Sequence, residues 1–463
     1  MPKFVMLPVQ GPPITPIKPD WQRVAVCSVL CTAILLLTIT FCTSWSSPAS
    51  ACPSAVMNIE LPVALVGKRD QLRMFALKAK SEVGDKTVWT EMPFQLDPVD
   101  NVGRFIFFKD ESWRKDKIEL HDRMIFNTSG FGRRKKYGEA APCAGRTVYQ
   151  YQDKESPLNY AYLALCDGDR GPSAPEEKTN DSAPAVAYLK DKRTLSTSQY
   201  TYVFSQRNQM LFERISIGDG PANTQLIAED SDLLIKSDVK NFFTMRFDSS
   251  QIESYLEETR PGLIGTLARV SFYLKILFFK IKLSLTTDVT FYRDVGHIPM
   301  VVQLPVDAKK YLHPKSGILY SWKLSPEVSM NSDKLRMPTL DPAVTGKGYE
   351  ELSKIGLRNC SGEYCAFGFA ASVGDKALAM EFEIPIYMVK AGFFPQLVSD
   401  IGAFDEQMGW NLRQDKKEAP RMGLYFEVSG LPEGGHPWDF WLRLGSSESL
   451  HGSCPRGLNI TRL

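Results

Sequence analysis

The sequence lacks the motifs around which many enzyme sites are built. It has no glycine-rich dinucleotide or phosphate loop, no His-Glu-x-x-His pair, no Gly-x-Ser-x-Gly elbow and no Cys-x-x-Cys-His haem site. Histidine is scarce, and none of the five is spaced as one of a ligand pair. The five are His121, His297, His313, His436 and His451. These absences disfavour a hydrolase that depends on zinc or on a serine–histidine pair.

The sequence also lacks an excess of charge of one sign. Lysine and arginine number 55 against 53 aspartates and glutamates, and the net charge is +2. Such a balance argues against nucleic acid as the main partner. The chain has 463 residues, of which 43% are hydrophobic and 23% charged, and this is ordinary globular composition. A chain of this length can form two or three domains.

Long apolar runs are lacking except for one at 24–41. The run could extend for about 27 Å as a helix, which just matches a bilayer core. Lys18 and Arg23 precede it, and positive charge before a span favours a cytoplasmic N-terminus. The run therefore predicts a transmembrane anchor, with the bulk of the chain in the periplasm or exterior.

A cleaved signal peptide is the alternative interpretation of this run. Pro48-Ala-Ser-Ala51 ends in a small-x-small site, so cleavage would fall before Cys52. The same residues resemble a lipoprotein cleavage box. Under each interpretation the main body is exported.

The nine cysteines fit that location. Six of them lie in the exported part, where an oxidising compartment favours disulfides. Proximity in sequence favours Cys143–Cys166 and Cys360–Cys365, which leaves Cys52 and Cys454 to join the two ends. A metal site at Cys360 and Cys365 is the alternative, but no second Cys or His pair accompanies them.

The fold class predicted is mainly β, as an exported multi-domain β-sandwich body with one N-terminal transmembrane or signal helix. Runs rich in aromatic and β-branched residues alternate with Gly/Asp/Asn clusters, which is typical of all-β domains. The predicted order is a Pro-rich cytoplasmic tail at 1–23, the transmembrane or signal helix at 24–41, a tether at 42–57, a first β domain at 58–166, a linker at 167–185, a second β domain at 186–325, a connection at 326–348 and a third β domain at 349–463.

The stretch from Arg269 to Tyr292 shows the clearest strand pattern. Large apolar residues alternate there with lysine and small polar residues, a period of two that predicts a strand or a hairpin arm. The apolar positions, predicted to be buried, are Phe279, Ile281, Leu283 and Leu285. Lysines interrupt the stretch, so a second membrane span is not expected. Lysines beside large hydrophobes could instead contact an anionic membrane surface.

Two local signals predict other elements. Asp248-Ser-Ser-Gln251 has the spacing of a capping box, which predicts a short helix over 251–259. Gly374-Asp375 lies between two apolar runs and predicts a hairpin turn.

One acidic loop is the candidate metal site. Asp97, Asp100 and Asn101 place two carboxylates and an amide oxygen close together, with Gly103 allowing a sharp bend. Hard cations such as calcium bind oxygens of this kind. The alternative is a β-turn in which Asp and Asn bond to the backbone. No other cofactor is expected.

Two groups of residues are candidates for a ligand groove. His121 and Arg123 would share one face of a strand and could bind a small acidic ligand, although a surface charge cluster is the alternative. His436, Trp438 and Trp441 could line a groove for a sugar or peptide, because aromatic faces stack on apolar ligand surfaces. Packing inside a C-terminal sheet is the alternative for this second group.

Two segments resemble exported sandwich proteins. Met92-Pro-Phe-Gln-Leu-Asp97, followed by Glu119 to Phe126, is similar to the opening of bacterial exported β-sandwich proteins of unknown function, although His121-Asp122-Arg123 departs from their acidic turn. Arg260-Pro-Gly-Leu-Ile264 resembles a Gly-Pro segment of the large sandwich domains of polysaccharide lyases, with the two residues reversed. No catalytic residue follows from either resemblance.

The leading functional prediction is a non-catalytic, membrane-tethered binding or assembly component of a cell envelope. Its expected partners are the membrane and other envelope proteins or a glycan, with no nucleic acid. The first alternative is a lyase-like carbohydrate-active enzyme on a large β-sandwich. The second is a lipid-interacting envelope protein that uses residues 269–292. An aromatic groove with an adjacent acid and base would favour the enzyme, and an apolar cavity beneath 272–285 would favour lipid binding.

Overall fold

A computed structural model describes the part of the chain on which the structural statements below rest. It covers residues 56–60, 67–68, 71–79, 87–100, 105–107, 110, 117–118, 122–127, 130–136, 139–153, 158–167, 186–218, 224–276, 279–331, 349–414, 417, 421–446 and 458–462. The predicted anchor at 24–41 lies outside these ranges. Within them, no helix is long and apolar enough to cross a membrane.

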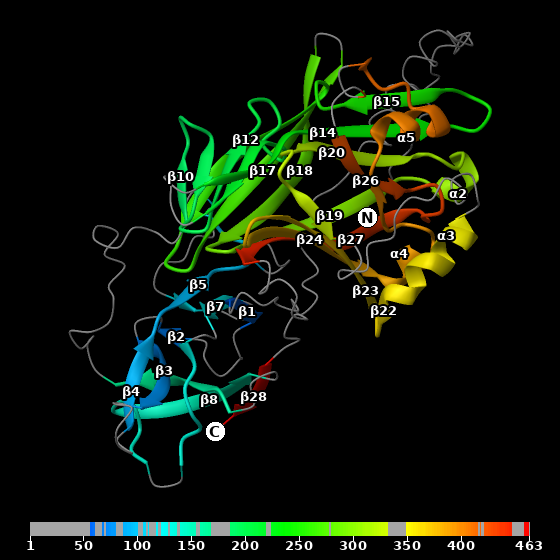
Figure 1. The fold of residues 1–463 in the computed structure, drawn as a ribbon. Coiled ribbons are helices and arrows are strands. Elements are labelled where there is room, and N and C mark those ends of the chain that lie inside the picture. The colour runs from blue at the N-terminus through cyan, green and yellow to red at the C-terminus, as the bar shows by residue number, and fades with distance from the viewer. Residues whose placement is uncertain are drawn as a thin grey trace, which may run out of the picture.

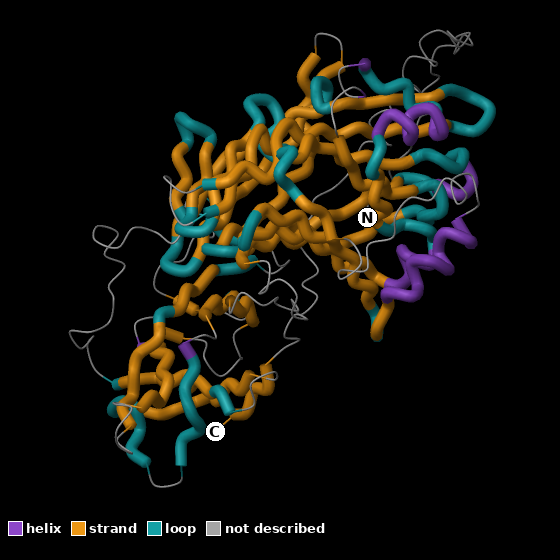
Figure 2. Tube along the Cα trace, in the orientation of Figure 1, coloured by secondary structure: helices purple, strands orange, loops and turns teal. Residues whose placement is uncertain are grey.

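The fold is mainly β, as predicted, and a large two-sheet sandwich forms most of it (Figures 1 and 2). The first sheet has nine strands, with β15 pairing only with β14. Its strands in spatial order are β10 (Ala187–Leu189), β11 (Thr194–Ser196), β12 (Tyr200–Phe204), β13 (Phe212–Ile217), β14 (Gln225–Asp238), β20 (Gly317–Leu324), β26 (Arg421–Glu427) and β25 (Pro395–Val398), with β15 (Thr244–Asp248) beside β14.

The second sheet also has nine strands, with β22 pairing only with β23. Its strands in spatial order are β16 (Ile252–Pro261), β17 (Gly265–Ile276), β18 (Phe279–Tyr292), β19 (Val295–Leu304), β27 (Gly434–Ser446), β24 (Lys376–Pro385), β23 (Tyr364–Val373) and β21 (Ser329–Asn331), with β22 (Cys360–Ser361) beside β23. Each sheet takes strands from both sides of the connection predicted at 326–348.

One apolar core lies between the two sheets. Alternate residues of each strand point inward, as in Phe382 of β24, Phe426 of β26 and Trp322 of β20, and all three belong to one buried cluster. Aromatic pairs cross the interface between the sheets, including Phe382 with Phe426 and Trp322 with Phe369. Packing of the two inner faces therefore leaves the outer faces available for other contacts.

A smaller β unit lies beside the sandwich (Figure 1). Its largest sheet has five strands in the order β28-β8-β9-β3-β4, and it has its own apolar core. The strands are β1 (Val56–Glu60), β2 (Gly67–Lys68), β3 (Leu72–Ala79), β4 (Thr87–Met92), β5 (Phe94–Asp97), β6 (Lys117–Ile118), β7 (Arg123–Asn127), β8 (Gly145–Asp153), β9 (Tyr160–Cys166) and β28 (Leu458–Arg462). The C-terminal strand β28 thus pairs within the N-terminal unit.

The helices of the described residues are short, namely α2 (Ala308–Tyr311), α3 (Tyr349–Gly356), α4 (Ile386–Lys390), α5 (Ile401–Met408) and the 3-10 turn η5 (Leu357–Asn359). Asp400 caps α5 by accepting from the Ala403 amide at 2.9 Å, and Gly409 ends it with a left-handed φ of 61°. Phe404 of α5 packs on Tyr425, which points outward from β26. The helix therefore covers part of the outer face of the first sheet.

The helix predicted over 251–259 is wrong, because β16 occupies this segment. The local signal nevertheless forms: the Asp248 amide donates to Gln251 Oε1 at 3.2 Å, and the Gln251 amide donates to Asp248 O at 2.9 Å. These bonds close a turn between β15 and β16. Nine residue pairs of β16 and β17 then form an antiparallel ladder, and this pairing overrides the helix.

The strand conformation predicted for Arg269 to Tyr292 is confirmed, but two strands share this stretch in place of one: β17 (Gly265–Ile276) and β18 (Phe279–Tyr292) pair antiparallel. The predicted hairpin at Gly374-Asp375 is confirmed, because this turn joins β23 to β24 with Gly374 at a φ of 57°. The side chains of Phe279, Ile281, Leu283 and Leu285 lie outside the described part of the structure, so their predicted burial stays a prediction.

Two disulfides join the cysteines that sequence proximity favoured. They are Cys143–Cys166, with Cα atoms 5.7 Å apart, and Cys360–Cys365, at 3.8 Å. Cys360 and Cys365 face each other at the end of β22 and β23. The predicted Cys52–Cys454 pair lies outside the described residues.

Candidate functional site

The outer face of the second sheet carries an unusual set of acidic side chains. On β24, Met380 and Phe382 point into the core, so Glu381 and Glu383 point outward. On the neighbouring β27, Asp439 points outward and is directly opposite Glu383 in the strand register. All three carboxylates are half-buried, which leaves them in contact with solvent. Three acids therefore lie on two adjacent strands.

Asp439 and Glu383 place two carboxyl groups of like charge opposite each other. Directly opposite residues have Cβ atoms about 4.5–5.5 Å apart, and like charges at this spacing destabilise a sheet. The next position in the same row on β23 is Ala366, and the residue opposite Asp439 on β19 is Pro299. The neighbours of the two acids at this register position are thus an alanine and a proline, neither of which carries a charge.

His297 of β19 holds Asp439 in place. Its Nε2 lies 2.8 Å from Asp439 Oδ1, so a proton on Nε2 donates to the carboxylate when Asp439 is ionised. The imidazole ring stacks on Trp441 with centroids 3.9 Å apart and an interplanar angle of 16°. His297 and Trp441 are opposite each other in the register, and this pairing explains the stacking.

The next acid, Glu381, is bound by a buried cation. Arg443 Nη2 donates to Glu381 Oε2 at 2.6 Å, and the Arg443 side chain is 2% exposed. Burial lowers the pKa of Arg443, while Glu381, Glu383 and Asp294 oppose this shift. One buried arginine thus lies among several carboxylates.

The N-terminal unit packs against another part of this face. Arg260 of β16 donates to Asp97 Oδ1 at 2.5 Å and to Ile106 O at 2.7 Å, and both side chains of the ion pair are almost fully buried. Gln95 bonds to Asp97 and accepts from the amides of Ile264 and Gly265. These contacts fasten the unit to the edge of the sheet.

A second arginine strengthens the same junction. Arg269 of β17 bonds to Asp288 and Asp110 at 3.0 Å, and its guanidinium lies 4.3 Å from the centre of the Phe107 ring. Burial raises the pKa of Asp288, with Arg269 opposing the shift. Charges in the covered part of the face are thus paired with opposite charges.

The candidate site adjoins this junction. Ile125 of the N-terminal unit forms a small apolar cluster with Tyr292, Val295 and Trp441 of the sheet. Trp441 therefore touches the N-terminal unit on one side and His297 on the other. The acids are at the boundary between the covered and the open parts of the face.

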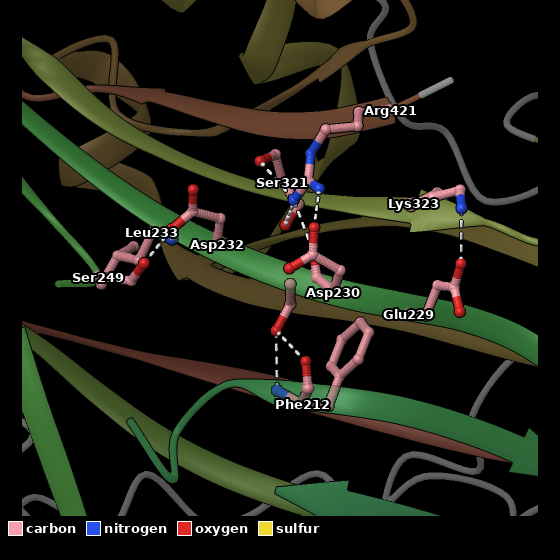
Figure 3. Close-up of polar contacts among 10 residues, drawn as sticks. Phe212, Glu229, Asp230, Asp232, Leu233, Ser249, Ser321, Lys323 and Arg421 are labelled. Carbon is pink, nitrogen blue, oxygen red and sulfur yellow. Dashed lines mark hydrogen bonds and ion pairs between the residues drawn. The ribbon is translucent and has the colours of Figure 1, made fainter. Parts of the chain in front are cut away.

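The outer face of the first sheet shows a different arrangement of charges (Figure 3). Asp230 has a left-handed φ of 49° at an irregularity of β14, and its carboxylate pairs with the buried Arg421 of β26. Lys323 donates to Glu229 at 2.7 Å. At this irregularity the Ser231 side chain takes the place of backbone hydrogen bonds to β13. Its Oγ accepts from the Phe212 amide at 2.7 Å and donates to Phe212 O at 2.9 Å.

The ligand-groove residues predicted from the sequence are separated by the fold. Trp441 belongs to the candidate site, whereas Trp438 points to the interior between the sheets. His436 is buried and its Nε2 donates to Pro432 O at 2.9 Å, and burial lowers its pKa. Arg123 is buried in β7 of the N-terminal unit, and His121 lies outside the described residues.

The structure describes two of the three predicted metal residues, Asp97 and Asp100. Asp97 is bound by Arg260 and Gln95, Asp100 is half-buried, and Asn101 lies outside the described residues. No group of three or more His, Cys, Asp or Glu in the described ranges is placed to hold a metal ion. A calcium site stays a prediction.

Sequence reasoning missed His297, Glu381, Glu383 and Asp439. A signal was present in Met380-Glu-Phe-Glu-Ile384, where acids alternate with apolar residues and so share the outward face of a strand. The sequence does not indicate which strands are neighbours. Pairing of β24, β27 and β19 is what brings these side chains together.

Neither a family model nor a curated protein matches the sequence. Two solved structures from Enterococcus faecalis are similar: an α-mannosidase, with a TM-score of 0.37 and 5% identity, and a protein of glycosyl hydrolase family 38, with a TM-score of 0.40 and 4% identity. The likenesses cover 89% and 90% of this chain but 44% and 46% of those chains. The chain thus spans less than half the length of either structure.

The leading functional prediction from the sequence is corrected by this comparison. A non-catalytic, single-pass membrane component of a cell envelope was expected, whereas the similar structures are described as an α-mannosidase and a glycosyl hydrolase family member. At these TM-scores and identities the likeness itself carries no argument about an activity, so the proposal below depends on the geometry of the site.

Proposed function

We propose that this chain is a carbohydrate-active enzyme that cleaves glycosidic bonds at the outer face of its second sheet. The observation that carries the proposal is the directly opposite pair of carboxylates, Glu383 and Asp439, which are half-buried on that face. Glycosidases use two carboxyl groups about 5–10 Å apart on either side of the bond to be cleaved. Opposite residues of adjacent strands fall naturally within this range.

The two carboxyl groups have different surroundings, which favours different roles. Asp439 contacts His297 Nε2, which orients its carboxylate, so Asp439 would act as base or nucleophile. Glu383 would carry the proton given to the leaving oxygen. Stacking on Trp441 fixes the imidazole of His297. The ion pair with Arg443 fixes the carboxylate of Glu381, the acid two residues before Glu383 on β24. The acid and the base thus come from neighbouring strands of a rigid sheet.

Two disulfides support an oxidising location for this activity, outside the cytoplasm. The partner of such an enzyme would be a glycan. Lyase chemistry, the form of the carbohydrate hypothesis that the sequence favoured, differs from hydrolysis in its product and is separated by the experiment below.

The test is to measure new reducing ends released by the full chain from a panel of aryl glycosides and soluble polysaccharides. Glu383→Gln and Asp439→Asn should each lower kcat about 100- to 10,000-fold. Glu229→Gln, which changes a glutamate on the outer face of the first sheet, is the matched control and should leave kcat unchanged. Failure of the wild-type chain to cleave any member of the panel would refute the proposal, as would full activity of Glu383→Gln.

Isotopically labelled water then identifies the reaction. Hydrolysis places the label in the product, whereas elimination forms an unsaturated product without it. The second outcome would replace the hydrolytic mechanism with the lyase alternative while keeping the site.

A further inference from the structure

Four consecutive cations, Arg133-Arg-Lys-Lys136, form a basic run in the N-terminal unit. Between residues 130 and 144 the sequence holds these four cations and a single acid, Glu139. The net charge of the whole chain is only +2, so positive charge is concentrated here. A run of charge is most often a solvated face. It indicates a binding site where the backbone holds the cations in place and where acids do not neutralise them.

The backbone at the start of the basic run is fixed between two strands. Gly132 and Tyr160 of β9 exchange backbone hydrogen bonds of 2.9 and 2.6 Å, and the Arg133 amide donates to Leu77 O of β3 at 3.0 Å. Residue 132 has to be glycine, because a Cβ there would clash with the backbone of Leu77. The start of the run is therefore attached to β3 and β9 at once.

Further bonds fix the end of the basic run and the residues after it. The Lys135 amide donates to the hydroxyl of Tyr162 at 2.6 Å, and Ala140 O accepts from the indole of Trp89 at 3.0 Å. The disulfide Cys143–Cys166 then joins the end of this segment to β9. Because the segment is ordered before a partner arrives, binding does not cost the entropy of ordering it.

One cation of the basic run has an acidic partner in the protein. Arg133 forms an ion pair with Glu139. In the part of the chain that the structure describes, no carboxylate pairs with the other three cations. Arg134 and Lys136 are exposed, and the guanidinium of Arg134 lies 5.9 Å from the centre of the Tyr160 ring. Three fixed positive charges are thus available to an anionic partner.

The surroundings of the basic run distinguish between polyanions. Single-stranded nucleic acid stacks its bases on exposed aromatic rings, but Trp89 and Tyr162 pack edge to face at 5.2 Å and Tyr162 is buried. Binding at a bilayer surface adds apolar side chains that enter the lipid, but Phe131, the large apolar residue described next to the run, is buried. Charge is therefore the main means of recognition, which fits a soluble linear polyanion.

We infer that the basic run anchors an acidic polysaccharide through the carboxylate or sulfate groups of the polymer. The choice of a polysaccharide among soluble polyanions rests on the proposed function, because a glycosidase has to hold a glycan. Carboxyl groups of the proposed catalytic face cannot attract an acidic polymer, whereas Arg134 and Lys136 can form charge-assisted hydrogen bonds with it. A polymer held by the N-terminal unit stays at a high effective concentration beside the adjoining second sheet.

Binding of four probes to the full chain tests the inference: carboxymethyl dextran, uncharged dextran, single-stranded DNA, and vesicles of phosphatidylglycerol and phosphatidylcholine in equal parts. Carboxymethyl dextran and dextran share a backbone and differ in their acid groups. We expect the acidic polymer to bind about tenfold more tightly than dextran, since several exposed ion pairs of modest strength add up. Raising the salt concentration from about 50 to about 200 mM should weaken its binding roughly tenfold.

Two double variants with the same loss of charge locate the binding surface. Arg134→Gln/Lys136→Gln should lower the affinity for carboxymethyl dextran about fivefold or more and leave the unfolding midpoint unchanged, because both side chains are exposed. Lys309→Gln/Lys310→Gln is the matched control, since it removes two exposed lysines of α2, away from the N-terminal unit (Figure 1). It should change the affinity by less than about twofold, because distant exposed charges are screened.

Binding and cleavage separate this inference from the proposed function. Binding of carboxymethyl dextran without cleavage of any glycoside would refute the glycosidase and keep the anchor. Cleavage of aryl glycosides with equal affinity for dextran and carboxymethyl dextran would do the reverse. An equal loss of affinity in the two double variants also overturns the inference. Tighter binding of DNA or of vesicles than of carboxymethyl dextran would overturn the assignment of the partner as a polysaccharide.

Discussion

The outer faces of the two sheets differ in how their charged side chains are arranged. On the first sheet, Asp230 pairs with Arg421 and Glu229 with Lys323. On the second sheet, the part under the N-terminal unit is arranged in the same way, with Arg260 bound to Asp97. The open part of the second sheet instead places carboxylates side by side. Ion pairs between opposite charges stabilise the folded protein, whereas adjacent carboxyl groups are suited to acid–base catalysis.

The largest expected effect lies in the covered part of the second sheet. Replacing Arg260 with Leu leaves Asp97 buried without its cation, and we expect the free energy of unfolding to fall by about 3–5 kcal/mol. Urea denaturation of the full chain measures this loss. A change below 1 kcal/mol would show that Asp97 is not buried in solution and that the N-terminal unit does not pack as described.

The next test uses the asymmetry of the Asp230–Arg421 pair. The Arg421 side chain is 1% exposed and the Asp230 side chain 58%. Asp230→Ala should cost about 3 kcal/mol of unfolding free energy, because it leaves the buried guanidinium without its carboxylate. Arg421→Met should cost only about 1 kcal/mol, because the aspartate that remains is in water. The reverse order of the two losses would contradict the assignment of Arg421 as the buried partner.

Removal of an acid from the open face should have the opposite sign. Glu383→Gln relieves the like-charge contact with Asp439, so it should raise the unfolding free energy by about 0.5 kcal/mol while lowering activity. Glu229→Gln, which breaks a matched pair, should not stabilise the protein. Urea denaturation at low salt measures the change in unfolding free energy of each variant. If Glu383→Gln destabilises the protein, the carboxylates have a structural role and the contrast between the two faces fails.

The smallest effect concerns pH. Glu427 points outward from β26 and accepts from Ser429, Tyr425 and the Lys315 amide, yet burial raises its pKa in the folded state. As the pH rises from about 4, the unfolded chain loses this proton first, so the wild type loses stability between that pH and the raised pKa. Glu427→Gln lacks this loss. Its unfolding free energy relative to wild type should therefore increase between pH 4 and 7.

Glu229→Gln is the control for that series, because Glu229 is more exposed and is bound by Lys323. A difference between Glu427→Gln and wild type that stays constant over the same range would show that Glu427 titrates in the folded protein as it does in the unfolded chain.

Local signals in the sequence were enough to predict much of the fold and little of the site. Alternation over 279–285 and the Gly374-Asp375 turn act between near neighbours, so the strand and the hairpin could be predicted. The capping box at Asp248–Gln251 was also real, but distant pairing with β17 decided the conformation of the residues after it. Local bonds of a few residues cannot outweigh a ladder of this length.

Prediction of the site would have required knowing which distant strands pair with each other. His297 and Asp439 are 2.8 Å apart in space, but the second residue follows the first by 142 positions. Their meeting depends on β19 pairing with β27, and the position of Glu383 depends on β24 pairing with β27. Composition favoured the aromatic residues of β27 as a group, yet strand alternation sends Trp438 and Trp441 to opposite faces. Only one of them reaches the acids.

The pairing of β28 with β8 also sets the order in which the protein can be completed. Leu458 of β28 pairs with Asp153 of β8. Because β28 follows the sandwich in the sequence, this edge of β8 has no partner strand until the whole sandwich has been translated. At about 5–20 residues per second, this delay is roughly 15–60 s. During that time the N-terminal unit presents an open strand edge, which is a template for pairing with other chains. The unit made first is thus the last to close, and a chaperone or an early contact with the nascent sandwich would have to protect it.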